Sequence, residues 1–462
     1  MKPESLPARS AARELVDFLH GLSLDRVPAS VTDAAKWCLL DTLGCALFGA
    51  PEPWSRIMAD EMLAEGSKGH SSVVGREQTL AAPAAALCNG TAAHGFELDD
   101  HLDEAIVHPG AIIISAAVAA AEAVDAPGSR LTLGIIAGYE MLNRLGLAMG
   151  VEPSRRGWHK TAVAGPVGAA VAAGVVMSLN ADQLMTAAGL ACATASGTKA
   201  FASGQGGGME KRMHAGRAAE AGVRMAQLAA RGFSAPPTAI DGRFGLLEVI
   251  SGNSARPELL SLDLGKHWAV EHVYVKVYPC CAWIQAAVQQ LVALRGPKPL
   301  KPHEIGKVKI GVSSYAGQQN GSVAPRDTMG AQFSIPYCAA LALTGDPADP
   351  AMFAPDAIDE PARRELARRI EIVADAEMEV AYPRHYGARV DLELANGEKR
   401  GSSVLDPHGM PADPVTEAER LDKFRRLASR VKSSESVAEI IKKVRSVERA
   451  KSVREISALL RN

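Results

Sequence analysis

Residues 111–124 read AIIISAAVAAAEAV, and this apolar run predicts the fold class of the chain. Apolar residues would occupy nearly every side of a helix drawn through it, and residues 165–177, GPVGAAVAAGVVM, have the same character. A helix of this composition is buried all round, and its small side chains let neighbouring helices approach closely. We therefore expect both segments to be central helices of a large helical assembly.

The helical pattern extends from about residue 10 to residue 231. Asn180 precedes a helical run as an N-cap residue does, and Gly232 follows the run 215–231 as a C-terminal cap does. Few β-branched alternating runs interrupt this half of the chain, so we expect it to be all helical.

After about residue 270, polar and apolar residues begin to alternate. Residues 307–314 alternate in this way, and residues 390–394 lead into Asn396-Gly397, a pair typical of a hairpin turn. Helical spacing returns in residues 334–343 and 359–370, which predicts helices packed on one sheet. The tail from residue 416 to 460 is charged and helical, and it opens with a capping box.

Length and composition indicate a globular protein. The chain has 462 residues, of which 47% are hydrophobic and 22% charged, and its net charge is −2 with both signs mixed along the length. Because no basic footprint is present, we expect no nucleic-acid partner. No apolar run is long enough for a membrane span or a signal peptide, so we expect a cytoplasmic protein without membrane contact. The seven cysteines form no CxxC pair and are expected to be reduced thiols.

The stretch most informative about chemistry is residues 94–110, HGFELDDHLDEAIVHPG, directly before the first apolar helix. It places three histidines and five carboxylates within 15 residues, which supplies proton donors and acceptors at the mouth of a buried helix. A solvated acidic loop is the bland alternative. A divalent cation is another, and its candidate ligands are Asp99, Asp100, Asp103 and His108. Their spacing matches neither an EF-hand nor HExxH, so we predict no metal.

Three further stretches carry ionisable groups, each with a structural alternative. Residues 156–161, RGWHKT, place His159 before the second apolar helix, where a packed histidine is the commoner case. Residues 204–217, GQGGGMEKRMHAGR, join a glycine-rich loop to cations at a helix start, which suits a carboxylate but also describes a basic surface helix. Residues 274–283, YVKVYPCCAW, place Lys276 in an apolar strand, either snorkelling to the surface or desolvated at a domain seam.

These stretches, in this order, resemble the MmgE/PrpD family, which includes 2-methylcitrate dehydratase, cis-aconitate decarboxylase and iminodisuccinate epimerase. The resemblance also includes residues 40–44 (LDTLG), 138–140 (GYE) and 333–337 (FSIPY), and it extends over nearly the whole chain.

The resemblance implies a mainly α fold, usually as a homodimer, in which a smaller α+β lid domain is inserted into a large all-helical domain. The corresponding segments are 1–268 and 403–462 for the helical domain and 269–402 for the lid. It also implies cofactor-free chemistry, in agreement with the absence of a GxGxxG fingerprint after a strand.

Residue types and resemblance together select the candidate site. Removal of a proton from the carbon next to a carboxylate produces an enediolate-like negative charge. Cations close to that charge would stabilise it, and imidazoles would accept and donate the proton. The predicted catalytic residues are Glu97, Asp100, His101, His108, His159, Lys211 and Lys276. The predicted substrate-binding residues are Arg212, His214, Tyr278 and Cys281.

Four positions depart from the family pattern. The family commonly has Asp at Glu97 and Thr at His101, the decarboxylase has His at Cys281, and other members often have His at Gln285. We expect a hydro-lyase acting on a small 2-hydroxy di- or tricarboxylate such as 2-methylcitrate. The alternatives are an epimerase of an imino- or amino-dicarboxylate, a cis-aconitate decarboxylase-like lyase, and an inactive carboxylate-binding protein.

Overall fold

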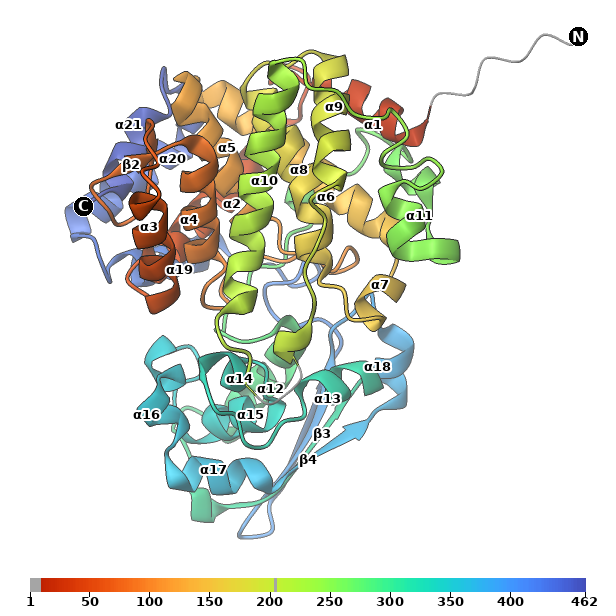
Figure 1. Cartoon of the computed structure of the whole chain (residues 1–462). Helices are drawn as coiled ribbons and strands as arrows, with labels where there is room; N and C mark the ends of the chain where they lie inside the picture. Colours follow the sequence, from red (N-terminus) through yellow and green to blue (C-terminus); the bar gives the residue numbers. More distant parts are fainter. Residues whose placement is uncertain (1–9, 203–205) are drawn as a thin grey trace, which may run out of the picture.

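The computed structural model describes residues 10–202 and 206–462, and most of its regular structure is helical. Helices of the N-terminal half form the upper body in Figure 1. Their bounds are α1 (Ala11–His20), α2 (Ala29–Gly49), α3 (Pro53–Ala64), α4 (Ala82–Ala93), α5 (Gly110–Val124), α6 (Gly128–Met149), α7 (Glu152–Arg155), α8 (Lys160–Val176), α9 (Ala181–Cys192), α10 (Glu210–Ala230) and α11 (Leu246–Ser251). A small antiparallel pair, β1 (Ser71–Ser72) and β2 (Thr79–Leu80), lies between α3 and α4.

The two apolar runs form α5 and α8, and both are buried at the centre of this body. α8 contacts α5, α6, α9 and α10, and every one of its residues is buried. It begins at Lys160, earlier than the start expected near Gly165, and Pro166 lies inside it. Burial of the whole segment thus outweighs the hydrogen bond that the proline removes.

The crossing of α10 and α4 brings two candidate stretches together. At this crossing a Cβ on Gly216 would lie 2.3 Å from the carbonyl oxygen of Leu87, and a Cβ on Gly90 would meet the Gly216 backbone at 2.8 Å. Only glycine permits so close an approach of two helices. As a result, the first turn of α10, which carries Lys211, lies beside the loop that follows α4.

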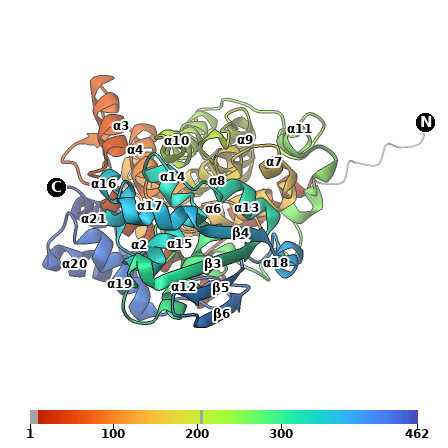
Figure 2. The same ribbon diagram turned by 90° about the horizontal axis from the view of Figure 1, so that it is seen from below.

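The smaller part of the chain is built on a four-stranded sheet with the order β4-β3-β5-β6. β3 pairs with β4 in parallel and with β5 antiparallel, and β5 and β6 form the predicted hairpin with Gly397 at positive φ. Seen from below, α15 and α17 lie beside β3 and β4, and α12 lies beside β5 (Figure 2). The strands are β3 (Ile305–Val312), β4 (Ile370–Ala374), β5 (Ala388–Leu394) and β6 (Lys399–Val404). The helices are α12 (Gln285–Arg295), α13 (Ser314–Asn320), α14 (Thr328–Gln332), α15 (Ile335–Thr344), α16 (Pro355–Ile358), α17 (Pro361–Arg368) and α18 (Ala376–Ala381).

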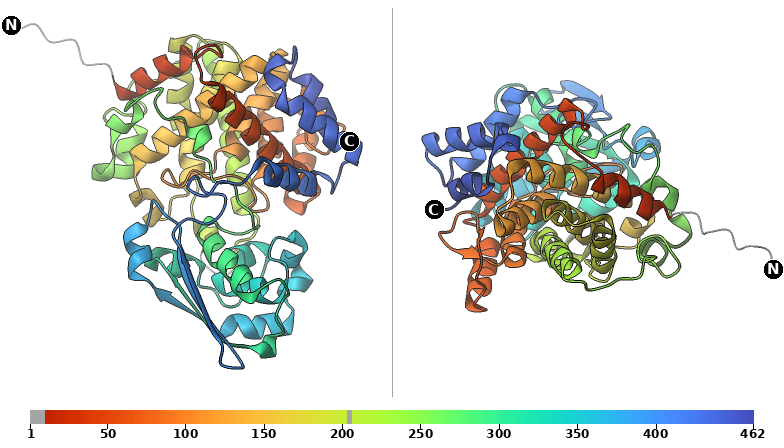
Figure 3. Two further views of the ribbon diagram at one scale, coloured as in Figure 1. Left: turned by 180° about the vertical axis from the view of Figure 1, so that it is seen from behind. Right: turned by 90° about the horizontal axis from the view of Figure 1, so that it is seen from above.

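The C-terminal helices return to the helical body (Figure 3). α19 (Glu417–Ala428) and α20 (Ser434–Arg445) contact α2, and α21 (Arg454–Ser457) contacts α5. The buried Lys423 of α19 donates to the Leu98 carbonyl at 2.7 Å and pairs with Asp41 at 2.8 Å, so the tail holds the loop 94–110 in place.

The mainly α fold class is therefore confirmed. The predicted domain limits at 268/269 and 402/403 stay predictions, and β6 runs past the second limit to Val404. Among the described residues, no helix combines the length and apolarity that crossing a membrane requires. Gly204 and Gln205 of the predicted glycine-rich loop lie outside the described residues.

Candidate active site

A cavity of about 50 Å³ lies between the helical body and the smaller part of the chain. It collects six of the predicted residues: Glu97, His101, His108, His159, Lys211 and Cys281. Residues from both parts complete its wall, among them Ser154, Lys160, Thr161, Lys199, Phe201, Trp283, Gln319 and Phe333. Sequence segments far apart in the chain therefore meet at one enclosed site.

Glu97 is the centre of a buried ion cluster at this cavity. Its carboxylate pairs with the Nζ of Lys211 and, at 3.1 Å, with the Nζ of Lys276, and Nη1 of Arg212 lies 3.6 Å away. The backbone of Glu97 has a φ of 58°, the left-handed region that is uncommon for residues other than glycine. That conformation, which costs free energy, is held where the carboxylate meets the three cations.

The charges of this cluster do not cancel. Burial by itself would raise the pKa of Glu97, but Lys211 and Lys276 hold that pKa well below its usual range, so the carboxylate is ionised. Burial lowers the pKa of Lys211, whereas Glu97 and Asp99 raise the pKa of Lys276 against the effect of its burial. Glu97 is the carboxylate that pairs with the three cations, and the nearby ionised Asp99 offsets part of the remaining charge. Two carboxylates near three cations still leave positive charge available to an anionic ligand.

His108 is oriented by a second hydrogen-bonded group. Its Nδ1 lies 2.9 Å from the Asp100 carbonyl and 3.2 Å from a carboxylate oxygen of Asp99, which also accepts from Nδ1 of His94 at 2.7 Å. Because both neighbours of Nδ1 are acceptors, Nδ1 of His108 carries the proton and Nε2 is the basic nitrogen. Burial, and after it the nearby Lys276, keeps the pKa of His108 well below its usual value.

His159 lies at the start of a chain of hydrogen bonds that leads away from the cavity. Its Nδ1 is 2.8 Å from Nδ1 of His214, and Nε2 of His214 is 3.2 Å from the half-exposed carboxylate of Glu210. The carboxylate can only accept, so neutral His214 donates from Nε2 and accepts at Nδ1. His159 then donates from Nδ1 and keeps its own Nε2 unprotonated. Burial also lowers the pKa of His214 to about 4, so this imidazole is neutral at pH 7.

His101 and Asp100 are placed differently from each other. Nδ1 of His101 lies 2.9 Å from a carboxylate oxygen of Asp103, and the ring borders the cavity. Asp100 instead accepts from the Tyr139 hydroxyl at 2.6 Å and from the Gly110 amide at 2.7 Å, and its side chain does not line the cavity. Burial raises the pKa of Asp100 to about 7. Asp100 contacts His108 through its backbone carbonyl and not through its side chain. The catalytic role predicted for Asp100 therefore stays a prediction.

Both halves of the chain match models of one protein family. Residues 13–258 match the MmgE/PrpD N-terminal domain, and residues 278–449 match the MmgE/PrpD C-terminal domain. The chain belongs to the MmgE/PrpD family. The family members it resembles include a cis-aconitate decarboxylase-like protein, oryM, of Aspergillus oryzae, with 30% identity over 99% of this chain and 98% of the relative.

Two further relatives carry the name cis-aconitate decarboxylase. The protein of Aspergillus terreus is 29% identical over 97% of this chain and 95% of its own length. The human protein is 25% identical over 98% of this chain and 95% of its own length. Full-length similarity of this kind extends the MmgE/PrpD assignment to the whole chain.

The predicted substrate-binding residues of this MmgE/PrpD protein are not all at the cavity. Cys281 lines it, with a thiol whose pKa burial raises to about 11. Arg212 lies behind Glu97, donates to Gln332 of α14 at 2.7 Å and stacks over Trp54. His214 reaches the cavity only through His159, and Tyr278 does not line it. The roles predicted for Arg212, His214 and Tyr278 stay predictions.

Sequence reasoning missed two lysines in the cavity wall. Lys160 donates to the carbonyls of Gly146 and Gly150 at 2.8 and 2.7 Å, and burial lowers its pKa to about 7. Lys199 also lines the cavity, and it lies near enough to Lys211 for the two positive charges to repel each other. One signal could have found Lys199, since no other charged residue occurs between Asp182 and Glu210.

The metal alternative can be tested on the donor atoms. The structure separates Asp100 and Asp103 from the group and leaves His94, Asp99 and His108, whose donor atoms lie within 4.8 Å of one another. A cation there would need bare nitrogens, yet Nδ1 of both imidazoles faces the same carboxylate oxygen as a hydrogen-bond donor. The arrangement thus fits a hydrogen-bonded trio better than a set of metal ligands.

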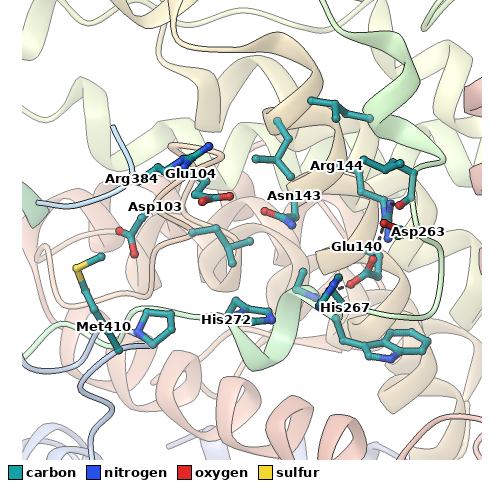
Figure 4. A pocket seen from close by; sticks show the side chains of 18 of the residues that line it. Asp103, Glu104, Glu140, Asn143, Arg144, Asp263, His267, His272, Arg384 and Met410 are labelled. Carbon is teal, nitrogen blue, oxygen red and sulfur yellow. Dashed lines mark hydrogen bonds and ion pairs between the residues drawn. The ribbon is translucent and has the colours of Figure 1, made fainter. Parts of the chain in front are cut away.

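A larger cavity of about 490 Å³ has residues 102–104 in its wall, and Figure 4 shows the side chains of Asp103 and Glu104 there. Five carboxylates and two arginines line it, and one of those arginines, Arg144, already pairs with Glu140 at 2.9 Å. This excess of negative charge disfavours a polyanionic ligand. The small cavity with its surplus of cations is therefore the better candidate for a site that binds carboxylates.

Proposed function

We propose that this MmgE/PrpD protein is a cofactor-independent lyase that decarboxylates a small unsaturated tricarboxylate of the cis-aconitate type. The observation that carries the proposal is the cluster in which Glu97 pairs with Lys211, Lys276 and Arg212 beside two imidazoles. Surplus cations at a desolvated site favour a polyanion and stabilise an electron pair that moves onto its carboxylate. The names of the full-length relatives support the same reaction.

The residues suit the proton and charge movements of this reaction. The bond between one substrate carboxylate and its carbon atom breaks, and carbon dioxide leaves. The electron pair of that bond stays on the substrate and spreads onto a neighbouring carboxylate held by Lys211 and Lys276. An imidazolium then gives a proton to carbon. A bound polyanion raises the low pKa values of His108 and His159, because it favours their charged forms.

Each turnover of this kind takes up one proton from solvent. The chain His159–His214–Glu210 ends at a carboxylate whose side chain is 45% exposed. It offers an inward route once both imidazoles reverse their tautomers, so that His214 accepts a proton at Nε2 and donates from Nδ1 to His159. Such a connection to solvent can supply a proton to a cavity walled mostly by buried side chains.

The cavity is smaller than the pockets that hold ligands of this size, which are typically about 300 Å³ or larger. Substrate entry therefore requires the smaller part of the chain to move away from the helical body. Movement of this kind commonly encloses a reaction and excludes water from it.

A hydro-lyase acting on a 2-hydroxy di- or tricarboxylate is the second candidate. It is favoured by His101, a further imidazole at the cavity that is tied to Asp103 at 2.9 Å. Dehydration needs one group to take the proton and another to protonate the departing hydroxyl, and two separately supported imidazoles meet that need. Epimerisation of an imino- or amino-dicarboxylate would use the same pair.

Incubation of the purified protein with each class of acid in deuterated water distinguishes these reactions. Decarboxylation of cis-aconitate gives carbon dioxide and a product with one new carbon-bound deuterium, detected by proton NMR and mass spectrometry. Alkene formation from 2-methylcitrate would support the hydro-lyase. Exchange of a carbon-bound proton for deuterium, without loss of water or carbon dioxide, would support the epimerase. Absence of turnover and exchange with the whole panel would refute the proposal.

A further inference from the structure

Lys199 is held at the cavity by backbone pairing with the segment that carries His159. The amide of His159 donates to the Gly197 carbonyl at 3.1 Å, and the amide of Lys199 donates to the Gly157 carbonyl at 2.8 Å. Gly197 has a φ of 111°, and a Cβ there would lie 2.5 Å from that of Ala162, so glycine is required at this turn. The position of Lys199 relative to His159 is thus fixed by the backbone.

The hydrogen bonds of the Lys199 ammonium to described residues all go to neutral acceptors, and the nearest charged group acting on it is another cation, Lys211. Its Nζ lies 2.9 Å from the Tyr315 hydroxyl and 2.9 Å from the amide oxygen of Gln319, both on α13. The rings of Trp283 and Tyr315 lie beneath it, with centroids 5.2 and 5.1 Å away. Burial lowers the pKa of Lys199 to about 8, so most of the ammonium is charged at pH 7.

This environment contrasts with that of the two lysines paired with Glu97. Lys211 and Lys276 already share the Glu97 carboxylate, whereas no carboxylate of the described chain pairs with Lys199. A half-buried ammonium with neutral acceptors gains from an incoming anion, because a hydrogen bond between two opposite charges replaces one to a neutral oxygen. Exchange of the Gln319 oxygen for a ligand carboxylate would satisfy the ammonium.

We propose that Lys199 is a specificity-determining residue, which binds a carboxylate of the substrate other than the one held near Glu97. The inference rests on the proposed function, and it deepens that function by stating which acids are accepted. A substrate must carry a second carboxylate that reaches Lys199, while the Glu97 cluster holds the carboxylate next to the reacting carbon. Monocarboxylates and amides at the distal position are poor substrates for this reason.

The test compares Lys199→Met with Lys199→Arg in the full-length protein. With the tricarboxylate that is turned over, Lys199→Met raises KM roughly 10- to 100-fold, the value of one charged hydrogen bond, and changes kcat much less. Lys199→Arg retains most of the affinity. With the distal monoamide of the same acid, wild type and Lys199→Met have nearly equal KM values, because the partner of the ammonium is gone.

Two controls separate substrate binding from a structural role. Tyr315→Phe removes a contact of Lys199 but keeps its charge, so it leaves the discrimination between acid and amide intact. Lys307→Met removes an exposed lysine of β3 that pairs with Glu371, and it changes neither kcat nor KM. If Tyr315→Phe reproduces the effect of Lys199→Met, the lysine is a structural tether and the proposal is wrong.

Calorimetric binding of propane-1,2,3-tricarboxylate keeps this test independent of turnover. Weaker binding to Lys199→Met than to wild type supports the inference even if no acid is converted, an outcome that refutes only the proposed reaction. Equal binding by both proteins overturns the inference, even if decarboxylation is observed.

Discussion

Replacement of Glu97 by Gln is the most direct perturbation of the candidate site. Glutamine keeps the size of the side chain but removes the only carboxylate among the described residues that pairs with Lys211 and Lys276. Removal of one partner from a buried ion pair costs about 3–5 kcal/mol, because the remaining charge is left uncompensated. We expect a loss of this size in the free energy of unfolding of Glu97→Gln at pH 7.

The loss has an upper limit and a pH dependence that follow from the lysines. Deprotonation of a lysine of ordinary pKa at pH 7 costs about 4.6 kcal/mol. If keeping the unpaired ammonium buried costs more than this, the lysine loses its proton instead, and the cost of deprotonation becomes the limit. The folded variant then holds a neutral lysine, while the unfolded chain holds a charged one. Because the unfolded state binds more protons, the stability of Glu97→Gln rises from pH 7 towards pH 9 and its deficit shrinks.

Thermal and chemical unfolding at pH 7, 8 and 9 measure this deficit. Glu97→Asp keeps the charge and serves as the matched control, and Glu365→Gln, at a side chain that is 65% exposed, controls for the loss of a surface carboxylate. Propane-1,2,3-tricarboxylate should restore part of the stability, about 2.7 kcal/mol at 100 times its Kd. Equal stability of wild type and Glu97→Gln, or an equal loss in Glu97→Asp, would refute the electrostatic account.

Three further predictions concern the groups around this cluster. His214→Asn breaks the route from His159 to Glu210, so kcat falls roughly 10- to 100-fold with little change in KM. Added imidazole restores part of the rate. An unchanged solvent isotope effect on kcat would contradict the route. Prolonged EDTA treatment leaves turnover intact, and loss of activity that a divalent cation restores would show that His94, Asp99 and His108 hold a metal. Burial raises the pKa of Asp100 to about 7, so near pH 6 this side chain binds a proton in the folded state that it lacks when unfolded. Wild type therefore gains stability relative to Asp100→Asn as the pH falls from 8 to 6. Urea unfolding at both pH values measures this difference, and an equal change in the stability of the two proteins would contradict it.

The sequence was sufficient for the class of fold and for several local features. Asn180 is the N-cap of α9 as expected, Thr416 forms the expected capping box of α19, and Gly397 lies in the predicted hairpin. These features depend on neighbouring residues in the chain, so periodicity and turn chemistry describe them well. The start of α8 was placed too late, because Gly165-Pro166 suggests a helix boundary that burial overrides.

The candidate site was predictable only in part. The stretch 94–110 and the segment around Lys211 were identified from their density of ionisable groups, and His108 and His159 lie at one cavity. The sequence did not distinguish the two neighbouring carboxylates of Asp99 and Asp100. Asp99 orients the imidazoles of His94 and His108, whereas the Asp100 side chain is held by Tyr139.

The amino-acid sequence by itself determined a mainly helical MmgE/PrpD protein whose ionisable groups gather in a few ordered motifs. Only the tertiary structure decided which of these groups meet. Glu97 is 114 residues from Lys211 and 179 residues from Lys276, and Lys199 reaches Tyr315 across a separation of 116 residues. Contacts over such separations depend on how whole helices pack, as at the glycine crossing of α4 and α10, and no local pattern of residues specifies that packing.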